Sequence, residues 1–456
     1  MTAHFPRSFA SCIRFRWSCF VALATLCTLP FSQINAQENN SPPAGFTALF
    51  NGENLDGWFG QKDTNPYGLT ELSRLQRAEM MVADHANMQQ HWRVEDGAIF
   101  NDGHGVFLST ENEYRDYELW IDYKTVAKAD SGIYLKACPQ VQIWDTTEEG
   151  GKWHIGADKG SGGLWNNRQD SAGKDPLALA DKPFGEWNRF RILQIGQRTS
   201  VWLNGQLVVD HAIMHNKHWK KGHPLPVAGP IWLQTHGGEI SWKNIFIREI
   251  PIAEANQILA EKANDGYSSL FNGEDFSGWS GPTDNYEVVN KAIQCKTNAG
   301  GTIFTDEEYS DFSIRFEFKL PPGGNNGLAI RYPGQGDTAY VGMCELQVLD
   351  NTADSYADLD SRQYHGSAYG KAAAHRGYLR KPGQWNFQQV DVVGSKINVE
   401  LNGTVILECD VADIQEVLGD RAHEGKDRTS GHFGFAGHGS PVAFRNITIK
   451  KIEPEE

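Results

Sequence analysis

The chain has 456 residues, enough for two to four domains, and a formal net charge of −15 at pH 7. Such an acidic surface argues against nucleic acid or an anionic membrane as a partner. Its 47 glycines and 14 tryptophans favour β-sheet domains with many turns and with aromatic side chains that can stack on sugars.

The N-terminus has the pattern of a secretory signal. Arg7, Arg14 and Arg16 precede a short apolar run over residues 19–31, and the small residue Ala36 is followed by a polar stretch. We therefore predict a signal peptide over residues 1–36 and export to the periplasm or the cell exterior. No later segment is apolar enough to cross a membrane, so no membrane insertion of the mature chain is expected.

The rest of the chain repeats itself. GFTALFNGENLDGW at residues 45–58 returns as GYSSLFNGEDFSGW at 266–279, QVQIWD at 140–145 returns as ELQVLD at 345–350, and VWLNG at 201–205 returns as VELNG at 399–403. Matches in one order predict a tandem duplication. We assign the copies to residues 37–252 and 266–456, with a linker or short helix over 253–265.

The first copy contains an insertion. The copies are offset by 221 positions at Asn51 and Asn272 but by only 205 at Gln142 and Gln347, so the first copy has extra residues between these points. The stretch 61–90 has a helical pattern in its middle. We expect a helical insert there, decorating a loop of a β-domain.

Short strands dominate both copies. VWLNGQLVVD places apolar alternation on both sides of Asn204–Gly205, a strong hairpin signal because both residues tolerate positive φ. YELWIDYKTV and FSIRFEFKL also alternate with period two. The fold class is therefore all-β, with two packed antiparallel sheets in each copy.

Taken in order, LFNGxxxxGW, SGIYLK or NGLAIR, QVQIWD or ELQVLD, GGLWNN, the VxLNG hairpin and LQTHGG resemble the 3-keto-disaccharide hydrolase domain family, once per copy. The resemblance implies two concanavalin A-like jelly-roll sandwiches. It also implies cleavage of glycosides that are oxidised at C3, with a glycoside or oligosaccharide as the substrate.

The strand ELQVLD carries the main candidates for chemistry. Glu345 and Gln347 point to one face of a strand, which suits an acid or base beside a sugar-binding amide. Asp350, at the end of the strand, is a candidate to hold a hydroxyl or a water. The first copy keeps Gln142 and Asp145 but has Gln140 in place of the carboxylate, so another residue such as His154 or Asp145 acts there, or that copy only binds.

Further candidates lie in the loops and at strand ends. Arg331 and its counterpart Lys136 are expected to neutralise an oxyanion. The loops after these strands and two matching strand ends supply possible acids, bases and sugar contacts: His365, Tyr369, Lys371, Trp165, Asn166, His236 and His438.

For 3-keto substrates, Glu345 and His365 are expected to act as base and acid, and Arg331 or Lys136 to stabilise the enolate. An ordinary glycosidase is the second hypothesis, although Glu345 and Asp350 point to opposite faces. A third is a pair of non-catalytic carbohydrate-binding modules. No metal site or cofactor is predicted; the oxygen-rich runs DTTEEGG and DNTADSYADLD suggest Ca²⁺ only weakly, because they lack the EF-hand order.

Overall fold

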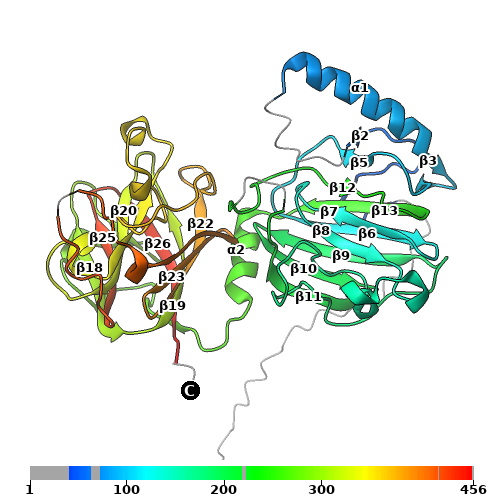
Figure 1. The fold of residues 1–456 in the computed structure, drawn as a ribbon. Helices are drawn as coiled ribbons and strands as arrows, with labels where there is room; N and C mark the ends of the chain where they lie inside the picture. The colour runs from blue at the N-terminus through cyan, green and yellow to red at the C-terminus, as the bar shows by residue number, and fades with distance from the viewer. Residues whose placement is uncertain (1–40, 63–71, 218–221, 420, 454–456) are drawn as a thin grey trace, which may run out of the picture. The chain divides into compact units, whose positions relative to one another are not determined.

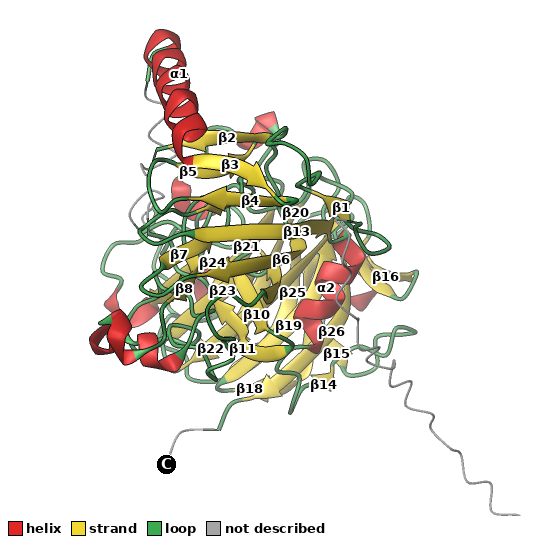
Figure 2. Ribbon diagram, turned by 90° about the vertical axis from the view of Figure 1, so that its right-hand side faces the viewer, coloured by secondary structure: helices red, strands yellow, loops and turns green. Residues whose placement is uncertain are grey.

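The computed structural model describes residues 41–62, 72–217, 222–419 and 421–453, so the predicted signal peptide lies outside the described residues. Two β-sandwiches succeed each other along the chain (Figure 1), each built from an eight-stranded and a five-stranded antiparallel sheet. Strands dominate the fold (Figure 2). Within the described ranges, no helix is long and apolar enough to cross a membrane.

The first sandwich contains β1 to β13. Its larger sheet has the order β11-β10-β9-β6-β13-β4-β3, with β1 paired to β13, and its smaller sheet has the order β2-β5-β12-β7-β8. The bounds are β1 Thr47–Ala48, β2 Trp58–Gln61, β3 Trp92–Glu95, β4 Ala98–Asn101, β5 Phe107–Thr110, β6 Tyr117–Thr125, β7 Asp130–Tyr134, β8 Gln140–Trp144, β9 Asn188–Ile195, β10 Arg198–Leu203, β11 Gln206–Ile213, β12 Trp232–Leu233 and β13 Ile240–Glu249.

The second sandwich repeats this topology. Its larger sheet has the order β16-β17-β26-β19-β22-β23-β24, with β14 paired to β26, and its smaller sheet has the order β15-β18-β25-β20-β21. The bounds are β14 Ser268–Ser269, β15 Trp279–Ser280, β16 Tyr286–Val289, β17 Ala292–Cys295, β18 Gly301–Tyr309, β19 Phe312–Lys319, β20 Asn325–Tyr332, β21 Cys344–Leu349, β22 Trp385–Val393, β23 Lys396–Leu401, β24 Thr404–Asp410, β25 Gly431–Gly437 and β26 Ala443–Lys451.

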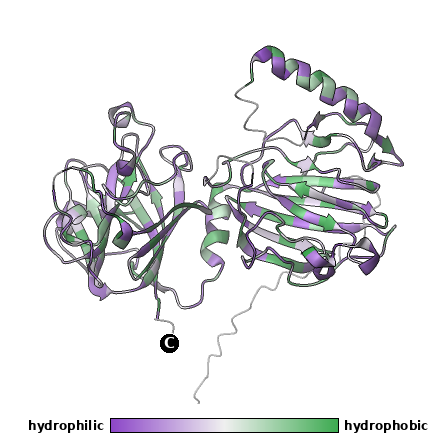
Figure 3. Cartoon of the chain, in the orientation of Figure 1, coloured by the Kyte–Doolittle hydropathy of each residue, from purple (hydrophilic) through white to green (hydrophobic). Residues whose placement is uncertain are grey.

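Each sandwich closes around its own apolar core. Strands of both sheets alternate hydrophobic and hydrophilic residues (Figure 3), and the apolar side chains meet between the sheets. Burying a large apolar side chain stabilises the fold by about 1.5–3 kcal/mol. The polar residues that alternate with the core residues are thereby placed on the outer faces of the sheets.

The predicted hairpins are confirmed. Asn204 and Gly205 connect β10 to β11 with φ of 52° and 86°, and Asn402 and Gly403 connect β23 to β24 with φ of 51° and 79°. Two positive φ values give the turn whose twist matches that of the strands.

Three α-helices occur in the described residues. The predicted helical insert is α1 (Arg74–His91), which begins at a capping box formed by Ser73 and Gln76. Helix α2 (Ile252–Glu261) follows the first sandwich and packs against β22. The short α3 (Thr338–Val341) packs against β20 and β21 of the second sandwich.

Candidate functional site

The five-stranded sheet of each sandwich has one face on the core and one face pointing away from it, which we call the site face. In β21, Leu346 and Val348 belong to the core, so Glu345 and Gln347 lie on the second site face. This is the arrangement that the sequence alternation predicted.

The second site face has a floor of small residues. Gly327 pairs with Gln347 on one side and with Ala436 on the other, and in the next row Ala329 pairs with Glu345. A Cβ atom at Gly327 would lie 2.1 Å from Oε1 of Glu345. The Glu345 carboxylate therefore lies over the glycine, in space that any larger residue would fill.

Glu345 forms a pair with a histidine from a neighbouring strand end. Its Oε1 lies 3.6 Å from Nε2 of His438, with side-chain exposures of 6% and 47%. The proximity of Glu345 raises the pKa of His438 above its ordinary value, against burial, which lowers it. Beside this pair, Nε2 of Gln347 donates to Oδ1 of Asn325 at 2.7 Å. A carboxylate, an imidazole and two amides thus share one face.

The first site face has large aromatic side chains at positions where the second has small residues. By strand register, Tyr134 takes the place of Ala329 and Trp232 that of Gly434. Tyr134 and Trp232 cluster with Phe107 and are buried. This part of the first site face therefore offers no room for a sugar ring.

A carboxylate nevertheless lies two rows further along the first site face, beyond the row of Gly132. Oδ2 of Asp130 accepts from Nδ1 of His236 at 2.8 Å and from Nζ of Lys152. Its Oδ1 accepts from Nε2 of Gln142 at 2.8 Å. Burial raises the pKa of Asp130, but the bonds from His236 and Lys152 outweigh it, so the pKa lies below the ordinary value.

The two copies have exchanged acid and amide between neighbouring strands. Gly132 pairs with Gln142 as Gly327 pairs with Gln347, so Asp130 corresponds to Asn325. The same register makes Gln140 correspond to Glu345. Each site face therefore keeps one carboxylate next to the equivalent histidine, but from a different strand.

The sequence profile of the 3-keto-alpha-glucoside-1,2-lyase-like domain matches residues 45–248 and 266–450. The chain belongs to this family. A 3-keto-disaccharide hydrolase from Bacteroides thetaiotaomicron is 24% identical over 251 residues, which cover 46% of this chain and 86% of that protein. Two lyase-like domains in tandem, and a carbohydrate-active role, follow from these matches.

Solved structures also align with the chain. A provisionally assigned glycosyl hydrolase from Parabacteroides distasonis is 23% identical, covers 41% of this chain and 99% of its own, and gives a TM-score of 0.38. A carbohydrate-binding module, CBM66 from Bacillus subtilis, is 13% identical, covers 38% of this chain and 96% of its own, and gives a TM-score of 0.25.

The structure places His365 where it cannot serve as the expected acid. Its ring stacks on Phe318 at 5.0 Å and is 1% exposed, on the core side of β21. Burial lowers the pKa of His365 to about 3, so the imidazole is neutral at physiological pH. His438, which sequence reasoning ranked second, takes its place beside Glu345.

Arg331 and Lys136 are buried side chains that lie away from the site faces and bind backbone carbonyl groups. Arg331 donates to three carbonyl oxygens at 2.8–2.9 Å and to Oδ1 of Asp311 at 2.9 Å, and Lys136 donates to the carbonyl of Gly196. Both residues have φ near 50°, which interrupts the strand alternation and redirects their side chains. The expected role in stabilising an enolate does not fit these positions.

We expect Arg331→Met to destabilise the second sandwich by about 3–5 kcal/mol, because it removes a buried donor that serves three carbonyl groups and Asp311. Denaturant unfolding measures this change. The control is Lys451→Met, which breaks the exposed pair with Glu307 and is expected to cost less than about 1 kcal/mol. Equal effects of the two variants would show that Arg331 does not hold the fold together.

Asp145 and Asp350 have matching structural roles. Oδ1 of each accepts from the backbone and hydroxyl of a threonine two residues later, and Oδ2 accepts from the backbone N–H of Lys128 or Gly323. Although burial raises the pKa of both carboxyls, these bonds lower it below the ordinary value. The oxygens of both carboxyl groups already accept hydrogen bonds within turns, so the expected contact with a hydroxyl or water is not supported.

The predicted loop residues Trp165 and Tyr369 occupy matching positions in the two copies. The backbones of Trp165 and Tyr369 donate to the carbonyls of Gln140 and Glu345, which confirms that they correspond to each other. The ring of Trp165, however, is covered by Nζ of Lys174 at 3.8 Å. The remaining loop residues have these positions: Asn166 accepts from the backbone of Gln140, Lys371 is buried against His423, and His154 is exposed on a 3-10 helix (Trp153–Ile155).

Sequence reasoning missed Asp130, Lys152 and Asn325. Asp130 lies 106 positions from His236, so no local motif joins them. The usable signal was the comparison of the copies, in which an acid and an amide exchange places between DSG and NNG and between QVQ and ELQ.

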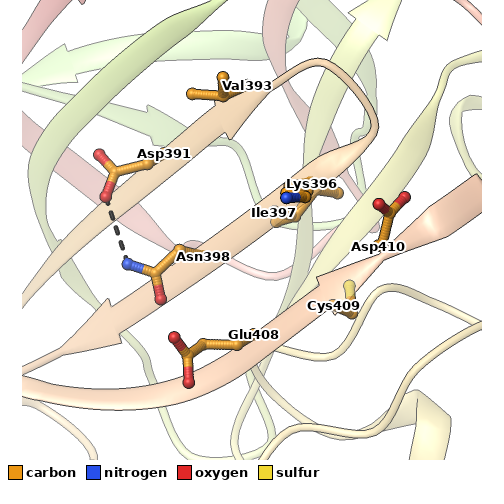
Figure 4. A pocket seen from close by; sticks show the side chains of 8 residues that line it. All are labelled: Asp391, Val393, Lys396, Ile397, Asn398, Glu408, Cys409 and Asp410. Atoms are coloured by element: carbon orange, nitrogen blue, oxygen red, sulfur yellow. Dashed lines mark hydrogen bonds between the residues drawn. The ribbon is translucent and has the colours of Figure 1, made fainter. Parts of the chain in front are cut away.

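A separate hollow of about 360 Å³ lies on the eight-stranded sheet of the second sandwich (Figure 4). Asp391, Asn398 and Glu408 form a row across β22, β23 and β24 there, and Nδ2 of Asn398 donates to Oδ2 of Asp391 at 3.3 Å. None of the predicted site residues lines this hollow. In the described part of the chain, no three His, Cys, Asp or Glu side chains are grouped as metal ligands.

Proposed function

We propose that the chain cleaves the glycosidic bond of 3-keto-glycosides at the second site face, by elimination across C1 and C2 followed by addition of water. The observation that carries this proposal is the buried Glu345 carboxylate paired with His438 above a floor of small residues. The name of the matched family and that of the Bacteroides thetaiotaomicron relative support the substrate class.

The ketone at C3 acidifies the proton at C2, and Glu345 takes this proton. The C–H electron pair forms the C1=C2 bond as the C1–O bond breaks, and His438 protonates the departing oxygen. Water then adds its hydroxyl to C1 and a proton to C2, which restores the sugar ring. Gln347 and Asn325 hold the sugar hydroxyls, while Lys371, buried nearby, adds positive potential.

The substrate class is tested by incubating the full chain with a 3-keto-disaccharide and with its unoxidised parent, and by following the released monosaccharide. We expect release from the keto form alone. Release from the unoxidised parent would support an ordinary glycosidase instead.

The N-terminal pattern leads us to place this activity outside the cytoplasm.

The proposed acid gives the reaction a pH dependence. His438 must carry a proton to act, and Glu345 raises its pKa, so activity is retained below that raised pKa and lost as the pH rises through it. We expect the basic limb of kcat/KM against pH to lie above 6.5 and to disappear in His438→Gln. A basic limb below pH 6.5 would contradict this role.

A non-catalytic sugar-binding role is the second candidate, and it applies to the first sandwich. Gln140 occupies the position that Glu345 has in the second sandwich. Binding of an unoxidised disaccharide without cleavage, measured by calorimetry, would favour it.

A further inference from the structure

The first site face carries a charged cluster that the proposed function does not use. Asp130, Lys152 and His236 meet at a single carboxylate oxygen, and Gln142 occupies the other oxygen. The Asp130 side chain is 12% exposed and the His236 side chain is 62% exposed. A largely buried carboxylate thus bonds to Nδ1 of a solvent-exposed imidazole.

This geometry fixes how the imidazole can work. With Nδ1 directed at Asp130, proton exchange with a ligand falls to Nε2, the second nitrogen of the ring. Asp130 itself is a poor base, because its oxygens already accept from three donors. Its contribution is to orient His236 and to stabilise the protonated ring.

The carboxylate has a different position in the two copies. In the second sandwich the row of Ala329 is bare and its carboxylate is Glu345. In the first sandwich Tyr134 fills that row, and the carboxylate is found two rows along β7, beside the histidine. Both copies therefore contain a carboxylate paired with a histidine, although Tyr134 fills the row in which the second copy has its carboxylate.

We propose that the first sandwich holds its own acid/base centre, in which His236 exchanges the proton with substrate and Asp130 is the positioning residue. This inference rests on the proposed function. His236 takes the C2 proton of a 3-keto-glycoside, the C–H electrons form the C1=C2 bond, and the C1–O bond breaks. The departing oxygen takes its proton from water, and hydration of the double bond follows as before.

The test uses the full chain and a 3-keto-disaccharide. Glu345→Gln removes the base of the second site face and leaves a residual rate, which we expect to fall at least tenfold when His236→Gln is added. If Glu345→Gln has no residual rate while the wild type is active, or if His236→Gln leaves the residual rate unchanged, this inference is overturned and the proposed function stands. A wild type without activity would overturn the proposed function itself.

A pH profile separates positioning from a structural role. In Glu345→Gln, adding Asp130→Asn removes the carboxylate that stabilises protonated His236, so we expect the acidic limb of the residual rate to move to lower pH. Lys152 also pairs with Asp130, and Lys152→Met should move the limb the opposite way. The control is Asp175→Asn, which loses the exposed partner of Lys159. An unmoved acidic limb in Asp130→Asn would refute the positioning role.

Discussion

Glu345→Gln is expected to lower turnover of a 3-keto-glycoside at the second site face by about 10²–10⁴-fold, the range associated with loss of a general base. Glutamine keeps the shape of the side chain but cannot accept the C2 proton. The turnover of His236→Gln is compared with that of the variant carrying both His236→Gln and Glu345→Gln. Activity of the first sandwich then does not mask the loss.

Glu308→Gln provides the matched control for this variant. Glu308 also faces a histidine of β25, with Oε1 at 3.7 Å from Nε2 of His432, but it is 52% exposed and lies at the other end of that strand. We expect near-normal turnover from it. Similar losses in both variants, or none in Glu345→Gln, would remove Glu345 from the mechanism.

Measured in a His236→Gln background, Gly327→Ala is expected to reduce turnover at the second site face by about 100-fold without unfolding the protein. The added Cβ would meet Oε1 of Glu345 at 2.1 Å and its Cδ at 2.4 Å, so the carboxylate must move. Gly327 has no positive φ, and alanine fits a strand there. A displacement of about 1 Å at a reacting group can cost about 10²-fold in rate.

A double-mutant cycle shows whether the loss acts through Glu345. With His236→Gln also present, a Glu345→Ala background lacks the clashing atoms, so adding Gly327→Ala should change the remaining rate little. Equal fold losses in the two backgrounds would mean that the methyl group acts elsewhere. Thermal unfolding checks that the fold of each variant is intact.

The fold was predictable because its signals are local. Strand alternation, the Asn-Gly hairpins and the repeated motifs each act over a few residues, and they led to two tandem β-sandwiches, for which the family resemblance implied the jelly-roll form. Alternation also placed Glu345 and Gln347 together on one face. The tandem organisation was thus visible before any tertiary contact was known.

The site was only partly predictable because its remaining contacts are long-range. Asp130 meets His236 across two strands that are far apart in the sequence, and nothing local marks that pair. Arg331 was misassigned because a positive φ breaks the alternation at its position. His365 was misassigned because its loop returns to the core, where Phe318 stacks on it.

The most direct test of the proposed chemistry is cleavage of a 3-keto-disaccharide in D₂O, with the released keto sugar analysed at C2 by NMR. Elimination and hydration remove the C2 proton and return a deuteron, so we expect deuterium at C2 well beyond that of an enzyme-free control. Full retention of the original proton at C2 would contradict the account and indicate direct displacement at C1.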